Sequence, residues 1–253
     1  MLLVCIFAIG TIIGSFLNVC IYRIPKEESI KFPGSHCAYC KKHIKAYDLI
    51  PIFSYIFLKG RCRYCKSKIS IRYPSIEFIT GILFTVTFIR YGMGINFFKY
   101  AFLVSLIIAI GVIDFDTTEV YFKTILFGMF SGAIFILIQF SCFDYSVHKS
   151  INYLYAGISG FCMIALIIFI TGGMGWGDAE ICFLCGLFLG LKENLIMIFI
   201  SFVIGGAVGI ILLASNIKSR KEHIPFGPFI AISTIITTLF SSEIINWYLN
   251  ILQ

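Results

Sequence analysis

The chain has 253 residues, of which 59% are hydrophobic and only 13% are charged. A soluble domain carries about 25% charged residues, so this composition excludes an ordinary globular enzyme and indicates a protein that crosses a membrane several times. The net charge is +7, and twelve of the twenty Lys and Arg residues lie between Arg23 and Arg72. In a membrane protein such a basic block is typical of a cytosolic loop, and we expect no nucleic-acid partner.

Eight apolar stretches predict about eight transmembrane helices. Their expected bounds are 2–21, 76–88, 97–113, 121–140, 153–170, 179–191, 195–216 and 224–240. The sixth stretch is short for a span of about 20 residues, so we expect it to be tilted or to enter mid-membrane. The first stretch lacks a basic segment before it and a good cleavage site after it, which favours a retained helix over a signal peptide.

The expected fold is an all-α polytopic membrane protein in three parts. Residues 1–22 form the first helix, residues 23–75 a small cytosolic zinc-knuckle domain, and residues 76–253 a seven-helix membrane domain. With both termini outside, sixteen basic residues lie on the inner side and four on the outer side, as the positive-inside rule requires. The inner residues beyond the loop are Lys123, Lys218, Arg220 and Lys221, and the outer residues are Arg90, Lys99, Lys149 and Lys192.

Four of the ten cysteines form two C-x2-C pairs in the polar loop, Cys37 with Cys40 and Cys62 with Cys65. This spacing is typical of a tetrahedral zinc site. Four protein ligands leave no open position for catalysis, so we expect a structural zinc ion that folds a loop with little apolar core. The alternative is four free or disulfide-bonded thiols. The neighbouring residues His36 and His43 are not expected to bind the ion.

Asp114 and Asp178 each follow an apolar stretch and fall on the same, cytosolic, side of the expected topology. A charge near hydrocarbon is costly and usually functional. Two carboxyl groups that share a proton can serve as acid and base in peptide hydrolysis, so we expect an aspartic protease dyad. Asp116 competes with Asp114, but Asp116-Thr117-Thr118-Glu119 is typical of a capping box that opens the next helix. For Asp178 the alternative is an N-cap, and for the pair it is the ion site of a transporter.

Glycines crowd the approach to Asp178 in the segment Gly172-Gly173-Met174-Gly175-Trp176-Gly177. A nucleotide-binding G-x-G-x-G turn requires a preceding strand, whereas an apolar helix precedes this segment. We therefore expect the glycines to let an extended substrate backbone approach the acid. A further C-x2-C pair, Cys182 and Cys185, has no partner pair and is expected to be an ordinary buried part of a helix.

Short motifs extend over nearly the whole chain. They are Gly14-Ser15-Phe16-Leu17-Asn18-Val19 with Arg23 and Pro25, the two cysteine pairs, Leu49-Ile50-Pro51, Ser70-Ile71-Arg72-Tyr73-Pro74 with Glu77, Ile113-Asp114, Gly173-Met174-Gly175-Trp176-Gly177-Asp178, and Pro225-Phe226-Gly227-Pro228. Together they resemble the bacterial type IV prepilin leader peptidase/N-methyltransferases, a family of membrane aspartic proteases. The chain departs from the usual family pattern at Val120-Tyr121, where a Pro is usual, and at Glu180, where a Lys is usual.

The resemblance implies that Asp114 and Asp178 are the catalytic pair. It implies cleavage of type IV prepilin or pseudopilin leaders after a glycine, at the cytosolic face of the bacterial cytoplasmic membrane. It also implies N-methylation of the new N-terminal residue with S-adenosylmethionine, in a part of the protein that includes the cysteine loop. The candidate cofactor-binding residues are Gly60, Arg72 and Glu77.

Two alternatives to this function stay open on the sequence. A transporter would have helices broken near mid-membrane, for which Gly205-Gly206 is the only hint. A non-catalytic zinc-loop scaffold would recruit pilus-assembly proteins.

Overall fold

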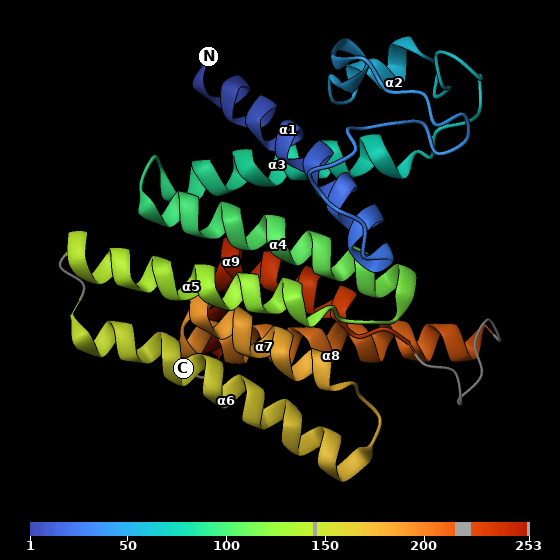
Figure 1. Ribbon diagram of the computed structural model, residues 1–253. Coiled ribbons are helices and arrows are strands. Elements are labelled where there is room, and N and C mark those ends of the chain that lie inside the picture. The colour runs from blue at the N-terminus through green and yellow to red at the C-terminus, as the bar shows by residue number, and fades with distance from the viewer. Residues whose placement is uncertain (144–145, 216–223, 252–253) are drawn as a thin grey trace. The chain divides into compact units, whose positions relative to one another are not determined.

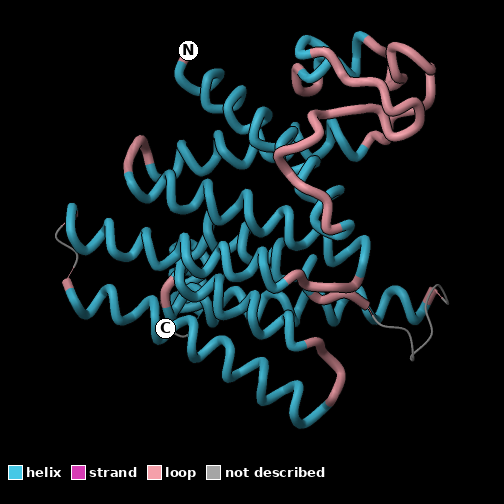
Figure 2. The backbone as a smooth tube through the Cα atoms, in the orientation of Figure 1, coloured by secondary structure: helices cyan, strands magenta, loops and turns pink. Residues whose placement is uncertain are grey.

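The computed structural model describes residues 1–143, 146–215 and 224–251. The described residues are mostly helical and contain no β-strand, only two isolated bridges in the loop. The chain divides into two compact units, residues 1–105 and residues 106–253. Figure 1 labels the helices, and Figure 2 distinguishes them from the loops. The all-helical fold expected from the composition is confirmed.

The first unit is built on the close packing of α1 (Leu2–Arg23) against α3 (Arg72–Tyr91). Glycines permit this approach, because a Cβ on Gly14 would lie only 2.7 Å from the Cα of Glu77, and a Cβ on Gly10 only 2.8 Å from the Cα of Gly81. Small residues at helix crossings are typical of membrane proteins, because helices in a bilayer associate mainly through the van der Waals contacts that a close approach of their backbones allows.

The polar loop joins these two helices. It contains the short helices η1 (Ile24–Lys26), η2 (Ala46–Leu49) and α2 (Phe53–Phe57). The buried guanidinium of Arg23, at the end of α1, donates hydrogen bonds to four carbonyl groups of the loop, which pin its first segment to the helix. Those carbonyls belong to Ser29, Ile30, Pro33 and Gly34.

The second unit is organised around α7 (Trp176–Leu189), which contacts α5 (Phe122–Cys142), α6 (Val147–Thr171), α8 (Leu191–Ala214) and α9 (Gly227–Ile251). Nearly all of α7 beyond its first turn is buried. At 14 residues this helix is shorter than the roughly 20 residues that a full span needs.

Among the described residues, six segments are long and apolar enough to cross a membrane. They are Leu2–Lys26, α4 (Ile95–Thr117), α5, α6, α8 and Gly227–Asn250. The helices α3 and α7 correspond to the second and sixth expected spans but are not among these six, so a total of eight stays a prediction.

Several expected boundaries are wrong. The fifth expected helix begins at Val147 and not near residue 153, because the hydroxyl of Ser146 accepts a hydrogen bond from the backbone N–H of Lys149 and caps an earlier start. The last helix does not end near residue 240, since it continues past a kink at Phe240 to Ile251. The expected end of the seventh helix, Asn216, and the basic residues Lys218, Arg220 and Lys221 lie outside the described residues.

The predicted capping box at Asp116 is also wrong. The helix α4 continues through this segment to Thr117, and Thr118 ends it with a positive φ of 57°. The next helix, α5, begins only at Phe122, with Tyr121 as its N-cap. Asp116 therefore lies in the last turn of one helix and not at the start of the following one.

Candidate functional site

Asp114 lies in the C-terminal part of α4, inside the second unit, and is only 4% exposed. Its Oδ2 atom accepts a hydrogen bond from the backbone N–H of Gly227, the first residue of α9, at 2.9 Å. A helix N-terminus presents free N–H groups and a partial positive charge, which favour an anion there. The backbone of α9 thus stabilises and orients this carboxyl group.

Asp178 is the third residue of α7 and is 7% exposed. Asp178 is not the N-cap itself, because the helix begins at Trp176 and Gly175 is its N-cap, but as the third helical residue it forms a capping box with Gly175, so the expected capping role is present beside the proposed catalytic one. The Oδ2 atom of Asp178 accepts the N–H of Gly175 at 3.2 Å. The preceding glycine turn begins at Gly172, which ends α6 with a φ of 61°.

The two acids lie near each other. The Asp114 carboxyl group acts electrostatically on Asp178. The turn after Asp114 also packs on the start of α7, since a Cβ on Gly177 would lie 2.5 Å from the Cβ of Val120. Asp116, two residues further along α4, is exposed. The structure therefore brings together the pair that the sequence predicted and leaves the competing acid at the surface.

The four loop cysteines form one cluster, and their sulfur atoms all lie within 4.8 Å of one another. No disulfide joins them, so of the alternative only the part with disulfide-bonded thiols is excluded, and the cluster contains neither His36 nor His43. A tetrahedral ion with metal–sulfur distances of about 2.3 Å separates its sulfurs by about 3.8 Å, and Cys37 Sγ lies 3.8 Å from Cys65 Sγ. The cluster therefore fits a four-thiolate metal site.

The two cysteine pairs sit in hairpins with the same backbone hydrogen bonds, 25 residues apart. The backbone N–H of Cys37 donates to the carbonyl of Lys42 at 3.0 Å, and the backbone N–H of Cys62 donates to the carbonyl of Ser67 at 2.9 Å. The turn residue after each pair, Lys41 or Lys66, has a positive φ of about 60°. Ser67 has a further role, because hydrogen bonds from its hydroxyl and backbone N–H lower the pKa of the Cys65 thiol to about 6. Thiolates are the form that binds metal.

An ion pair that the sequence did not reveal holds the second hairpin to η2. The guanidinium of Arg63, between the two cysteines of that hairpin, contacts both carboxylate oxygens of Asp48, at 2.8 and 2.5 Å. This pairing lowers the pKa of Asp48, chiefly through the hydrogen bonds from Arg63. Bidentate geometry of this kind fixes orientation as well as distance.

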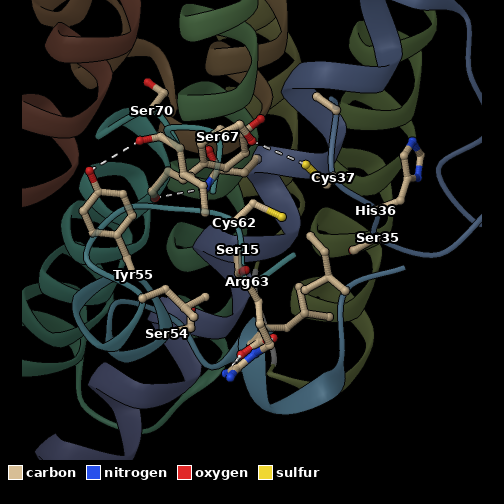
Figure 3. A pocket seen from close by; sticks show the side chains of 18 of the residues that line it. Ser15, Ser35, His36, Cys37, Ser54, Tyr55, Cys62, Arg63, Ser67 and Ser70 are labelled. Atoms are coloured by element: carbon tan, nitrogen blue, oxygen red, sulfur yellow. Dashed lines mark hydrogen bonds and ion pairs between the residues drawn. The ribbon is translucent and has the colours of Figure 1, made fainter. Parts of the chain in front are cut away.

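A cavity of about 410 Å³ lies in the first unit between α1, the cysteine loop and the start of α3 (Figure 3). Of the three predicted cofactor-binding residues, only Glu77 lines it. Gly60, at a φ of 65°, supports the wall indirectly, because a Cβ there would lie 2.9 Å from the hydroxyl of the lining residue Tyr55. Arg72 is the first residue of α3 and is not among the lining residues.

Two further expectations concern residues outside these sites. Cys182 and Cys185 are fully buried within α7, as expected for ordinary core residues. The helix α8 runs without interruption through Gly205 and Gly206. The broken helix that the transporter hypothesis predicted at this point is therefore not found.

Sequence comparisons connect both units with known proteins. A family model described as the bacterial peptidase A24 N-terminal domain matches residues 8–91, and one described as the type IV leader peptidase family matches residues 101–210. Among curated proteins, the prepilin leader peptidase/N-methyltransferase of Bacillus subtilis is 32% identical over 96% of both chains. Those of Neisseria gonorrhoeae and Legionella pneumophila are 31% and 30% identical, covering 95% and 94% of this chain and 92% and 91% of theirs. No solved structure matches.

Proposed function

Because the chain belongs to the bacterial prepilin leader peptidase/N-methyltransferase family, we propose that it cleaves the leaders of type IV prepilins or pseudopilins after a glycine and then N-methylates the new N-terminal residue. It is an integral membrane protease with methyltransferase activity. The catalytic site faces the cytosol from the bacterial inner membrane, and both termini lie outside.

Asp114 and Asp178 catalyse the cleavage. The observation that carries this proposal is their arrangement in one unit, each buried, each held by a glycine N–H, and each within electrostatic reach of the other. Repulsion between two such carboxylates keeps one protonated. The ionised acid takes a proton from water, which attacks the scissile carbonyl, and the protonated acid donates its proton to the leaving amine. The titration belongs to the pair, so neither role is assigned to one residue.

The metal site serves the loop and not the cleavage. Cys37, Cys40, Cys62 and Cys65 hold a structural zinc ion, because four thiolates in tetrahedral reach leave no position for water or substrate. The loop buries few apolar side chains, so the ion supplies much of its folding free energy. S-adenosylmethionine supplies the methyl group for the second reaction.

The dyad is tested by substituting each acid in purified protein and measuring leader removal from a prepilin by mass spectrometry. Asp114→Asn and Asp178→Asn should each reduce cleavage by about a hundredfold or more, since each removes a proton-transfer group. Asp116→Asn, which removes the same charge from the exposed position two residues away, is the matched control. Substantial cleavage by either of the first two variants at normal membrane levels would refute the dyad.

The same variants separate the alternatives. A non-catalytic scaffold requires both variants to keep pilus assembly intact, whereas the protease loses assembly together with leader removal. A transporter requires ion or solute uptake into proteoliposomes that depends on Asp114.

A further inference from the structure

The cavity in the first unit has walls from three parts of the chain. Asn18 and Tyr22 come from α1 and Glu77 from α3. Tyr55 and Cys62, labelled in Figure 3, come from the loop. Its volume of about 410 Å³ falls in the range of small-molecule sites, roughly 300–1,000 Å³. The hydroxyl of Tyr55 donates to the carbonyl of Ile69 at 3.4 Å, which fixes one wall. The cavity is therefore a preformed site for one small molecule.

Asn18 brings an unused hydrogen-bond acceptor to this cavity. The side chain is 3% exposed, and its Nδ2 atom donates to the carbonyls of Gly14 and Tyr73, at 3.2 and 3.1 Å. These two bonds fix the amide, and its Oδ1 atom is buried without a hydrogen-bond partner. Buried acceptors are costly when left unpaired, so a donor that reached this oxygen from the cavity would be stabilised.

Glu77 brings a carboxyl group to the same cavity. The side chain is only 8% exposed, and its hydrogen bonds come from neutral groups, the N–H of Ile52 at 2.7 Å and the hydroxyl of Ser15. A carboxylate offers about four lone-pair sites, so acceptor capacity is left over. A buried charge is stable when an opposite charge lies beside it, and a cationic ligand would supply that charge.

Aromatic side chains complete the lining. Five tyrosines face the cavity, namely Tyr22, Tyr39, Tyr55, Tyr64 and Tyr73. The faces of aromatic rings attract cations and stack on planar rings. The ligand that these groups fit is therefore small, carries positive charge with N–H donors, and includes a planar ring.

We propose that this cavity binds S-adenosylmethionine, with the Asn18 carbonyl and the Glu77 carboxylate as acceptors for its cationic groups. The inference rests on the proposed methyltransferase function and assigns that function a site. The ammonium group of the donor supplies N–H bonds to these acceptors, the charge of its sulfonium is attracted to the Glu77 carboxylate, and its adenine stacks on the tyrosines. The cysteine loop then matters for methyl transfer because it forms one wall of this cavity, with Cys37 and Cys62 among the lining residues.

The first test is direct binding of S-adenosylmethionine to the full-length, zinc-loaded protein in detergent, by equilibrium dialysis. Glu77→Gln keeps an oxygen that can accept the N–H of Ile52 and removes only the charge. We expect it to raise the Kd for S-adenosylmethionine by about tenfold or more, as for loss of a charge-assisted contact. Glu28→Gln removes an equal charge from an exposed position of the same loop and should leave the Kd within about twofold. Equal Kd values for the two variants would overturn the site.

A second measurement uses the unsubstituted protein, so it does not depend on the folding of a variant. Ultraviolet crosslinking of labelled S-adenosylmethionine should mark peptides within residues 15–77. Marks confined to residues 106–215 would overturn the site while the methyltransferase activity stood. A protein that neither binds S-adenosylmethionine nor methylates a cleaved pilin would remove the premise itself, and leader cleavage by that same sample would show the protease to be intact.

Discussion

The substitution Gly227→Ala tests how closely the carboxyl group of Asp114, proposed to be catalytic, is held. The Cβ of an alanine at position 227 would lie 2.6 Å from Asp114 Oδ2 and 3.0 Å from its Cγ. Ordinary van der Waals contacts begin at 3.4 Å, so the carboxyl group or the start of α9 must move by about 0.8 Å. A misplacement of about 1 Å at a catalytic group can cost about 100-fold in rate. We therefore expect kcat/KM for leader cleavage to fall by about 10- to 100-fold, or about 1.4–2.7 kcal/mol.

The assay is steady-state cleavage of a purified prepilin by equal amounts of folded protein. Gly206→Ala is the matched control, because a Cβ at this helical position in α8 meets no atom within 4 Å. Alanine favours a helix over glycine, so this control should keep full activity and normal membrane levels. Methylation of a peptide that has already been cleaved should be unchanged in Gly227→Ala. Cleavage by Gly227→Ala within twofold of the unsubstituted rate would refute the reasoning.

Three further outcomes are expected. Gly177→Ala places a Cβ 2.5 Å from that of Val120, so leader cleavage should fall by about tenfold or more. Adding Val120→Gly to this variant should restore part of the activity. Full activity of Gly177→Ala alone would contradict the packing of these two residues. Cys62→Ser leaves three ligands, so zinc measured by mass spectrometry should fall from about one ion per chain to near zero, with methylation lost; zinc at full stoichiometry would argue against the site. Arg63 depresses the pKa of Asp48 in the folded protein. The ion pair therefore stabilises the folded loop fully above the unfolded pKa of Asp48, about 3.9, and this stabilisation is lost only as the pH falls through the lower folded pKa. Asp48→Asn should therefore speed zinc release to a chelator by the same factor at pH 6 and pH 8, and a factor that changes between them counts against the ion pair.

Hydropathy and cysteine spacing were sufficient to predict much of this molecule. Long apolar segments must satisfy their backbone groups internally when they enter a membrane, so they form helices wherever they occur. The C-x2-C spacing is a local geometric requirement for metal binding, and the cluster of Cys37, Cys40, Cys62 and Cys65 follows from it. Asp114 and Asp178 could be paired because the alternation of spans assigns each helix end to one side of the bilayer.

Contacts between residues far apart in the chain could not be predicted in this way. Gly227 lies 113 residues from Asp114, and no local pattern shows that its N–H faces that carboxyl group. The unpaired oxygen of Asn18 is likewise visible only once α1 packs against α3. The capping motif at Asp116 misled for a related reason, since the same residues are compatible with one more turn of α4 and tertiary packing decided between the two.

The hydrogen bond between Gly227 and Asp114 has a consequence for biogenesis. A nascent chain that has inserted every helix through α8 already contains both acids but still lacks the backbone group that holds the first of them. With the proposed dyad, we therefore expect the protease site to be completed last, when α9 enters the bilayer, and partly synthesised chains to be inactive toward neighbouring membrane proteins. Deletion of the segment from residue 227 onward should yield a membrane-inserted, zinc-containing and proteolytically inert protein.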